Sequence, residues 1–340
     1  MHNFARTSGY TFLLCGVLAF IACKDGNSSD DKEDASTKAG GHSGGEGGSA
    51  GSAGTTGGTA GSSAGSNSGS SGIAGTDSGI AGADSGAAAT PFDCTNALFC
   101  ESFDNYPAVT AIADKQKFGP WHAALQKGAT MELDGKHKRS GGNALHVHLD
   151  NAVTSGGRLF ADGNQRIFNG KPTHLFGRMM MYIDPNGTSV HWTFFGATGT
   201  AEPNSPVVGK YSSYIMSSLP KKGVNTYSFV YGLSAPEGYH DCSSQSDTAM
   251  PSTWACVAFE MDSVTRKLRM YKDSATAPIL SVDDHGKGCV APTMVTSPWY
   301  GPAVDELFVG AWSFHAMNAP LDVWIDDVVV DTKPVPCTAP

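Results

Sequence analysis

Two adjacent acidic residues, Asp326 and Asp327, interrupt an apolar segment at residues 323–330. Successive side chains of a strand point to opposite faces, so neither face of this segment is purely apolar. A buried charge without a partner is energetically costly. The pair therefore predicts a compensating cation close to the strand, unless the carboxylates are solvated or paired with Arg or Lys.

Two histidines, His146 and His148, are expected on one face of a strand, because Leu145, Val147 and Leu149 form the opposite, apolar face. Two imidazoles at this spacing suit zinc or copper. No third ligand is evident in the sequence. A solvated strand face is therefore the favoured interpretation.

Tyrosine and tryptophan rings give flat, amphipathic surfaces on which sugars can stack. The candidates are Tyr211, Tyr214, Tyr227, Tyr231, Trp299, Tyr300, Trp312 and His315. Aromatic rings also fill sandwich cores, so about half of them are expected in the interior. The residues predicted to bind substrate are Tyr211, Tyr214, Tyr231 and Trp312. The tryptophans assigned to the core are Trp192, Trp254 and Trp324.

Glycoside hydrolysis needs two carboxylates about 5–9.5 Å apart. The acids within strand-like segments are Glu260, Asp326 and Asp327, and no Glu-x-Asp-x-x-Glu pattern is present. The sequence thus gives little support for a hydrolase.

The elements that must position these residues are strands. Residues 92–340 consist of short runs of β-branched, aromatic and alternating residues, separated by clusters of Gly, Pro, Asn and Asp. No long stretch has the period of an amphipathic helix. The pattern predicts an all-β domain of two packed antiparallel sheets. Strands are predicted at residues 144–149, 175–183, 189–198, 226–232, 256–261, 267–271, 307–314 and 323–330.

The start of the chain has the layout of a secretory signal at residues 1–22, with Arg6 before the apolar stretch FLLCGVLAFIA. Cys23 follows as the predicted lipid acceptor of a bacterial lipobox, although Phe20 matches that motif poorly. A plain signal peptide cleaved nearby is the alternative. Residues 24–91 lack aromatic residues and are dominated by Gly, Ser, Ala and Thr, so residues 23–91 are predicted to be a disordered tether.

The net charge of −9 argues against a nucleic-acid partner. It also argues against electrostatic attraction to anionic lipid, so the membrane is expected to be contacted only through the lipid anchor. Lys24 stands where an Asp would favour inner-membrane retention, so we expect an outer-membrane, cell-envelope location. The domain is expected to be a monomer.

The chain has eight cysteines, of which Cys15 leaves with the signal and Cys23 takes the lipid. An even set in an exported protein implies disulfides. Zinc is disfavoured, because no C-x₂-C pair exists. Fifteen pairings of the remaining cysteines are open. The favoured set is Cys94–Cys100, Cys242–Cys289 and Cys256–Cys337.

Several short segments occur in a definite order. They are ESFD at 101–104, RSGGNALHV at 139–147, GRMMM at 177–181, HWTF at 191–194, WACVAFE at 254–260 and VWIDDV at 323–328. Together they resemble the core domain of the fungal cellulose-induced protein family. That family has a concanavalin-A-like jelly roll similar to alginate and glucuronan lyases. The resemblance implies the same two-sheet jelly roll for residues 92–340.

The resemblance also implies a structural calcium site. In that family calcium links the first strand, a Ser-Gly turn and the Asp-Asp strand. By position, the ligands here would be Asp104, Ser140 and Asp326. Calcium takes carboxylate, carbonyl and water oxygens at flexible geometry, so this donor set is chemically reasonable.

Lyases of this shape need a group that neutralises a uronate and a residue that moves the proton. The resemblance makes Tyr231, His191 and Tyr214 the catalytic candidates. Ser212 and Tyr214 stand where His and Arg would assist, which weakens the case for a lyase. The candidates for binding the uronate are Arg158, Arg178 and Gln165.

The leading hypothesis is an exported lipoprotein whose calcium-stabilised jelly roll binds polysaccharide or cell-wall glycan through its concave sheet, without a complete catalytic site. The first alternative is a polysaccharide lyase that acts by β-elimination on a uronate-containing glycan. The second is a structural or adhesive surface protein.

Overall fold

The computed structural model describes residues 94, 96–107, 111–126, 128–151, 154–184, 187–234, 238–241, 246–284 and 298–337. The predicted signal, Cys23, the tether, Cys242 and Cys289 lie outside these residues. The described residues contain no helix that is long and apolar enough to span a membrane.

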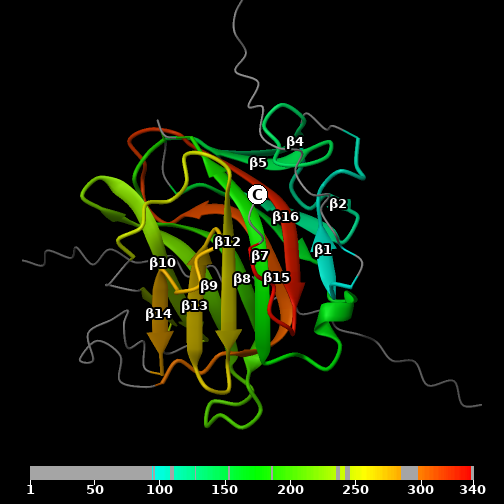
Figure 1. Ribbon diagram of the computed structural model, residues 1–340, viewed down its shortest axis with the longest axis vertical. Coiled ribbons are helices and arrows are strands. Elements are labelled where there is room, and N and C mark those ends of the chain that lie inside the picture. Colours follow the sequence, from blue (N-terminus) through cyan, green and yellow to red (C-terminus); the bar gives the residue numbers. More distant parts are fainter. Residues whose placement is uncertain are drawn as a thin grey trace, which may run out of the picture. The chain divides into compact units, whose positions relative to one another are not determined.

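One sheet, called sheet A, has eight strands in the order β14-β13-β12-β7-β16-β5-β4, with β1 beside β16. Its strands are β1 (Phe99–Glu101), β4 (Ala129–Asp134), β5 (Ala144–Leu149), β7 (His174–Ile183), β12 (Ala255–Asp262), β13 (Lys267–Lys272), β14 (Leu280–Asp283) and β16 (Leu321–Asp331). Figure 1 shows β12, β7 and β16 side by side in one layer.

The other sheet, called sheet B, has eight strands in the order β11-β10-β9-β8-β15-β6-β3-β2. Its strands are β2 (Lys117–Phe118), β3 (Trp121–Leu125), β6 (Gly156–Ala161), β8 (Trp192–Ala201), β9 (Tyr211–Lys221), β10 (Val224–Leu233), β11 (Gly238–Asp241) and β15 (Pro302–Ser313). One 3₁₀ turn, η1 (Arg166–Phe168), follows β6.

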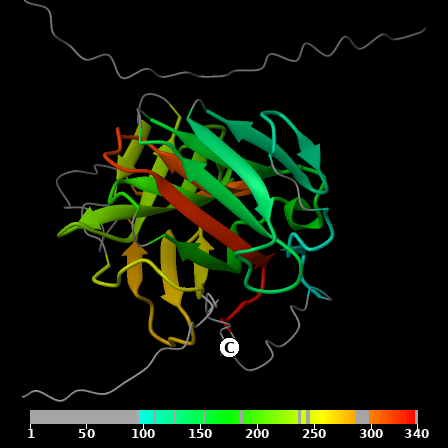
Figure 2. The ribbon, with the colours of Figure 1, turned by 90° about the horizontal axis from the view of Figure 1, so that it is seen from above.

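The two sheets form a sandwich, which confirms the predicted all-β jelly roll. All strand pairs of the described residues are antiparallel. One large hydrophobic cluster takes side chains from both sheets, so the core lies between them. Figure 2 shows the layers from above, with the red strand β16 inside its sheet.

Strand alternation decides which residues face the core. On β5, Leu145, Val147 and Leu149 are buried in the core, and His146 and His148 point outward as predicted. On β9 and β10 the core residues include Tyr214, Met216, Phe229 and Tyr231. The outward face of sheet B carries a separate apolar cluster of Ile215, Val230 and Phe308, with Phe160 packed against it.

The predicted strands match the structure well. The strand at 144–149 coincides with β5, and those at 175–183, 226–232, 256–261, 267–271 and 323–330 lie inside β7, β10, β12, β13 and β16. The strand predicted at 189–198 begins later, because β8 starts at Trp192. The strand predicted at 307–314 ends at Ser313 and starts earlier, at Pro302.

Two of the favoured disulfides are present, Cys94–Cys100 and Cys256–Cys337. The first closes a short loop at β1. The second ties β12 to the segment after β16, where both cysteines pack against Ala258. The third pairing, Cys242–Cys289, lies outside the described residues.

The two ends of the domain meet in sheet A, because β1 pairs with β16. Next to this contact, Glu101 is buried and accepts hydrogen bonds from Phe103 N (2.8 Å), Tyr106 Oη (2.8 Å) and Trp121 Nε1 (3.0 Å). The segment that leads to Asp104 is therefore held firmly against the rest of the domain.

Candidate functional site

The acidic pair of β16 lies at a β-bulge. The register between β16 and β7 shifts between Asp326 and Val329, and Asp327 has a positive φ of 49°. A bulge re-aims the side chains of the strand that carries it. Both carboxylates are buried, and Asp326 has no exposed surface (0%).

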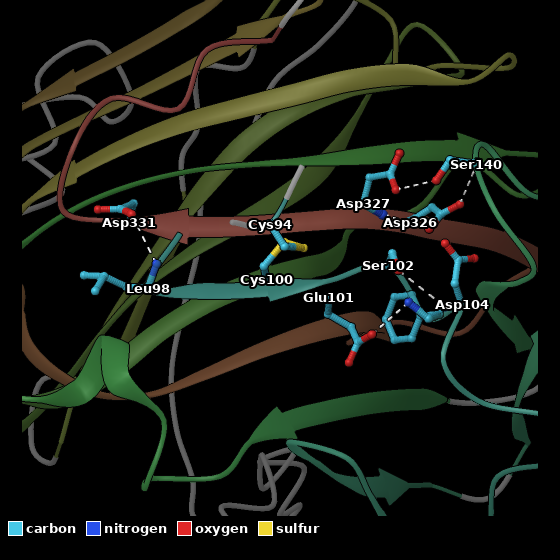
Figure 3. Close-up of a disulfide and its surroundings, with 11 residues drawn as sticks. Cys94, Leu98, Cys100, Glu101, Ser102, Asp104, Ser140, Asp326, Asp327 and Asp331 are labelled. Atoms are coloured by element: carbon cyan, nitrogen blue, oxygen red, sulfur yellow. Dashed lines mark hydrogen bonds between the residues drawn. A yellow bond between two sulfur atoms is a disulfide. The ribbon is translucent and has the colours of Figure 1, made fainter. Parts of the chain in front are cut away.

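The turn that carries Ser140 closes over this pair (Figure 3). Arg139 N and Ser140 N donate to Asp326 Oδ2 at 3.0 and 3.2 Å. Ser140 Oγ donates to Asp327 Oδ1 at 2.7 Å, and Asp327 N donates to Asp326 Oδ1 at 2.8 Å. These bonds join a turn and a strand that are far apart in the sequence.

Asp104 approaches the same turn from the segment after β1. Its Oδ1 accepts hydrogen bonds from Gly142 N and, at 3.3 Å, from Asn143 N. Gly141 has a φ of +51°, and a Cβ there would overlap the Asp104 carboxylate. The turn therefore needs glycine at this position. Asp104, Ser140 and Asp326, the three residues implied by the resemblance, converge on this one turn.

The electrostatics of the cluster indicate a shortage of positive charge. Burial, and then the charge of Asp327, raises the pKa of Asp326 to about 8. Burial raises the pKa of Asp327 as well, and the charge of Asp104 adds to this, although the Ser140 bond and Arg178 and Arg139 oppose it. Carboxylates in this state are stabilised by a proton or by a bound cation.

The donor chemistry fits a hard cation such as calcium, which prefers oxygen ligands. However, no three His, Cys, Asp or Glu side chains of the described residues are arranged to hold a metal ion. Each carboxylate of the cluster is instead held by backbone or hydroxyl donors. Cation binding would therefore require these side chains to leave some of those hydrogen bonds.

The outward face of sheet B carries a cross-strand row with an apolar centre. Phe160 of β6 pairs with Phe308 of β15, which pairs with Gly196 of β8, followed by Ile215 and Val230. The Phe308 ring occupies the space that a side chain at Gly196 would fill.

A second row runs beside it and is mostly polar. Trp312 of β15 pairs with Thr193 of β8, which pairs with Ser217 of β9. Arg158 lies between the two rows, with its guanidinium 4.1 Å from the Phe308 ring centroid and 4.8 Å from that of Trp312. Its Nη2 donates to Thr193 Oγ1 at 2.6 Å. Trp312 lies over Gly156, where any Cβ would overlap the indole.

A third row lies on the other side of the apolar row. Thr198 Oγ1 and Tyr211 Oη donate to Glu306 Oε1 at 3.1 and 3.4 Å. Tyr211 is 49% exposed. The face thus combines apolar surface with hydroxyl, carboxylate and guanidinium groups. Its members that reach solvent include Phe160, Arg158, Trp312, Glu306 and Tyr211.

Only two of the four predicted substrate-binding residues lie on this face. Tyr211 and Trp312 do, but Tyr214 and Tyr231 are buried between the sheets, each 1% exposed. Tyr214 Oη donates to Trp299 O, and Tyr231 stacks on the Trp299 ring at 5.4 Å. The prediction for Tyr214 and Tyr231 was wrong, because alternation in β9 and β10 turns both rings inward.

The three catalytic candidates are buried, and two of them, Tyr214 and Tyr231, are cross-strand neighbours with 6.2 Å between ring centroids. Tyr214 and Tyr231 are interior, and burial raises the pKa of Tyr214 well above its usual value. His191 is buried just before β8, against the rings of Phe314 and His315. Ser212 is also interior and donates to Tyr300 O at 2.6 Å.

The candidate uronate-binding residues are dispersed. Arg158 is on the outward face of sheet B, whereas Arg178 belongs to β7 of sheet A, where its Nη1 donates to Pro336 O at 3.4 Å. Gln165 precedes η1. None of the three lies beside Tyr214 or Tyr231 in a strand pairing of the described residues.

Sequence reasoning missed how some residues cluster. Arg158 was considered only as a uronate-binding residue, and Phe308 was not named. The alternation Glu306, Phe308, Trp312 within a strand was the available signal, and it was obscured by bulges in β15. Trp324, assigned to the core, is buried, but its ring lies on the outward side of sheet A against His146. Trp254, also assigned to the core, is only half-buried, and Tyr182 contacts both tryptophan rings.

Comparison with known proteins gives structural similarity alone. No family model matches the sequence, and no curated protein matches it. Among solved structures, the chain is similar to the cellulose induced protein Cip1, with a TM-score of 0.43 and 15% identity over 64% of this chain and 94% of that chain. Cip1 belongs to the family that the sequence motifs resemble.

Two further similarities involve more distant proteins. A beta-1,3-glucanase from Mycobacterium marinum gives a TM-score of 0.40 and 12% identity over 70% of this chain and all (100%) of that chain. The binding domain of botulinum neurotoxin DC gives a TM-score of 0.32 and 9% sequence identity over 63% of this chain. This chain spans 44% of that structure. At these values the similarities concern the fold.

Proposed function

We propose that this chain is an exported lipoprotein whose jelly roll binds polysaccharide or cell-wall glycan through the outward face of sheet B. The observation that carries the proposal is the arrangement around Arg158. Its guanidinium lies over Phe308 and Trp312 and donates to Thr193, between an apolar and a polar row.

This combination suits a sugar ring. Sugars present apolar C–H faces that pack on aromatic rings, and hydroxyls that need hydrogen-bond partners. Trp312 and Tyr211 supply rings that reach solvent. Glu306 supplies an acceptor, and Arg158 supplies planar donors in a fixed geometry. The face offers both kinds of contact side by side.

Binding without catalysis is favoured over β-elimination. The tyrosines proposed to move a proton are interior and are bonded to backbone carbonyls. Arg158, which would neutralise a uronate, lies on the opposite face of the same sheet. The lyase remains an alternative that the experiment below distinguishes.

We also propose that Asp104, Ser140 and Asp326 bind calcium as a structural ion. The support is the convergence of Asp104 and Ser140 on the turn over the buried Asp326 carboxylate, together with the raised pKa of Asp326. These residues would hold the ion, which would supply positive charge where the segment after β1 meets β16. Its contribution would be to stability and not to a reaction.

The cellular context is proposed from the sequence. Cys23 would carry the lipid, and residues 24–91 would hold the domain, as a monomer, away from a membrane that we take to be the outer membrane. The anchor would place the glycan-binding face at the cell envelope.

The test uses the chain with Cys23→Ser, which prevents lipidation. Retention on a panel of neutral and uronate-containing polysaccharides is measured, together with ultraviolet absorbance from unsaturated uronate products. We expect retention on at least one glycan with no absorbance change. Trp312→Ala should weaken that retention about tenfold, which corresponds to about 1.4 kcal/mol.

Tyr271→Ala is the matched control, because Tyr271 lies on the outward face of sheet A. It should bind as the parent does. A rise in absorbance would make the protein a lyase. The absence of both retention and an absorbance change would favour the structural or adhesive alternative.

A further inference from the structure

The outward face of sheet A carries a chain of alternating carboxylates and imidazoles. His146 Nδ1 lies 3.1 Å from Glu132 Oε1, and His146 Nε2 lies 2.8 Å from Asp322 Oδ1. His148 Nδ1 lies 2.8 Å from the same Asp322 oxygen, and its Nε2 lies 3.2 Å from Asp150 Oδ1. We call these five residues the acid–imidazole chain.

The chain joins three strands. Glu132 belongs to β4, the two histidines belong to β5, and Asp322 belongs to β16. The register places Glu132 opposite His146, and His148 opposite Asp322. These contacts therefore add side-chain links to the backbone pairing at the edge of sheet A.

The geometry at His146 specifies its protonation state. A neutral imidazole has one N–H donor and one acceptor nitrogen. If His146 were neutral, one nitrogen lone pair would face a carboxylate oxygen. Only the doubly protonated ring can donate to Glu132 and Asp322 together. Its side chain is 16% exposed, so water has limited access to replace either partner.

An aromatic ring also favours the cation. The Trp324 indole is stacked on His146, with 4.3 Å between ring centroids and 4° between the planes. A cation over the face of a tryptophan is stabilised by the ring quadrupole. On the edge of Trp324, Asp134 Oδ2 accepts from Nε1 at 3.0 Å and lies 3.1 Å from His137 Nδ1. Asp134 thus adds a further carboxylate near the Trp324 ring.

We infer that the acid–imidazole chain is a pH-sensitive clasp, in which a proton held by His146 ties β4, β5 and β16 together. Deprotonation would remove one of the two hydrogen bonds of His146 and leave one carboxylate facing a nitrogen lone pair. The edge of sheet A would then be less stable. The clasp lies apart from the proposed glycan-binding face of sheet B.

The direction of the pH effect follows from the pKa values. Burial alone would lower the pKa of His146, but hydrogen bonds and charges from Asp322 and Glu132 outweigh it and raise the pKa overall. A raised histidine pKa gives stability that is fully present below the ordinary value of about 6.5 and is lost as pH rises through the folded-state pKa.

Asp322 sets the lower limit of the pH range in which the clasp is stable. Burial would raise its pKa, yet hydrogen bonds from His146 and His148 outweigh this and lower it. A lowered carboxylate pKa gives stability that is lost as pH falls through the folded-state pKa. The clasp is therefore closed in mildly acidic solution and opens as the pH rises through the folded-state pKa of His146.

The first test observes the ring directly. In the full chain with Cys23→Ser, NMR of imidazole nitrogens follows each histidine against pH, and His146→Gln identifies the signal. We expect His146 to be doubly protonated at pH values above its ordinary pKa of about 6.5. A neutral His146 ring at about pH 6 would overturn the inference. Glu132→Gln, which keeps His146, should lower its titration midpoint.

The second test measures stability. Between about pH 6 and about pH 9 the unfolding temperature of the parent should fall by roughly 2–4 °C more than that of His146→Gln. His122→Gln is the matched control, because His122 lies on β3 of sheet B and its Nδ1 is also close to a carboxylate, 3.4 Å from Asp162 Oδ1. It should keep the parental slope. An equal slope in His146→Gln and the parent would contradict the clasp.

Discussion

At the scale of the residue, Asp326 shows how a local feature determines the behaviour of its surroundings. It has no exposed surface, it accepts three N–H bonds, and its neighbour is also an acid. Hydrogen bonds favour the charged form, but burial and the charge of Asp327 dominate, so the pKa rises to about 8. The residue therefore binds a proton when a cation is not available.

This predicts how stability depends on pH in the presence of a chelator. Folded Asp326 keeps a proton up to about pH 8, whereas in the unfolded chain it loses that proton near 3.8. Stability should therefore fall as pH rises between these values. Asp326→Asn should remove this part of the slope. Urea unfolding of both proteins at several pH values measures it.

Calcium provides the complementary result. At about pH 8, calcium at a hundred times its dissociation constant should stabilise the parent by roughly 2.7 kcal/mol. Asp326→Asn should gain much less. Equal pH slopes for the two proteins, together with no effect of calcium on the parent, would remove the basis for the proposed site.

Residue roles were predictable only where the backbone is regular. Strand alternation correctly placed His146 and His148 on the outward side of β5. It could not place Asp326 and Asp327, because the bulge and the positive φ of Asp327 are not visible in the sequence. The aromatic rings of Tyr214 and Tyr231 were predicted to lie on a surface. Aromatic residues in an alternating strand can equally face the core, so residue type alone did not decide between the two faces.

At the scale of the element, the strands could be predicted from the sequence, but the pairing between them could not. Short alternating runs located the long central strands, whereas β1 and β2 have 3 and 2 residues and leave little periodic signal. The pairing of β1 with β16 joins residues more than 200 positions apart, such as Phe99 and Val330, and Leu98 N beside it donates to Asp331 Oδ2. Nothing local specifies such a contact.

The two described disulfides should differ in their contribution to stability. Cys256 and Cys337 are 81 residues apart, whereas Cys94 and Cys100 are 6 apart. A longer loop restricts the unfolded chain more. Cys256→Ser with Cys337→Ser should cost roughly 4 kcal/mol, and Cys94→Ser with Cys100→Ser roughly 2 kcal/mol.

Denaturant unfolding without reductant measures both pairs. The long-range pair also holds the C-terminal segment over Met180 and Tyr271, so its loss should expose that surface. If the short-range pair were the more costly to remove, native packing around Cys94 and not loop closure would be the dominant effect.

At the scale of the whole molecule, two outward faces have different compositions. Sheet A carries the acid–imidazole chain and the rings of Tyr182, Trp254 and Trp324. Sheet B carries Arg158 over Phe308 and Trp312. The two-sheet architecture was predictable from strand patterns, but the assignment of each side chain to a face depended on strand order, which came only with the structure.

The location of the glycan-binding face can be measured directly through the six tryptophans. Their indole N–H signals, assigned by single substitutions, are followed by NMR while a retained glycan is added. We predict that the Trp312 signal shifts and that the signals of Trp254 and Trp324 do not. Movement of Trp254 or Trp324 with Trp312 unchanged would place binding on sheet A and contradict the proposed function.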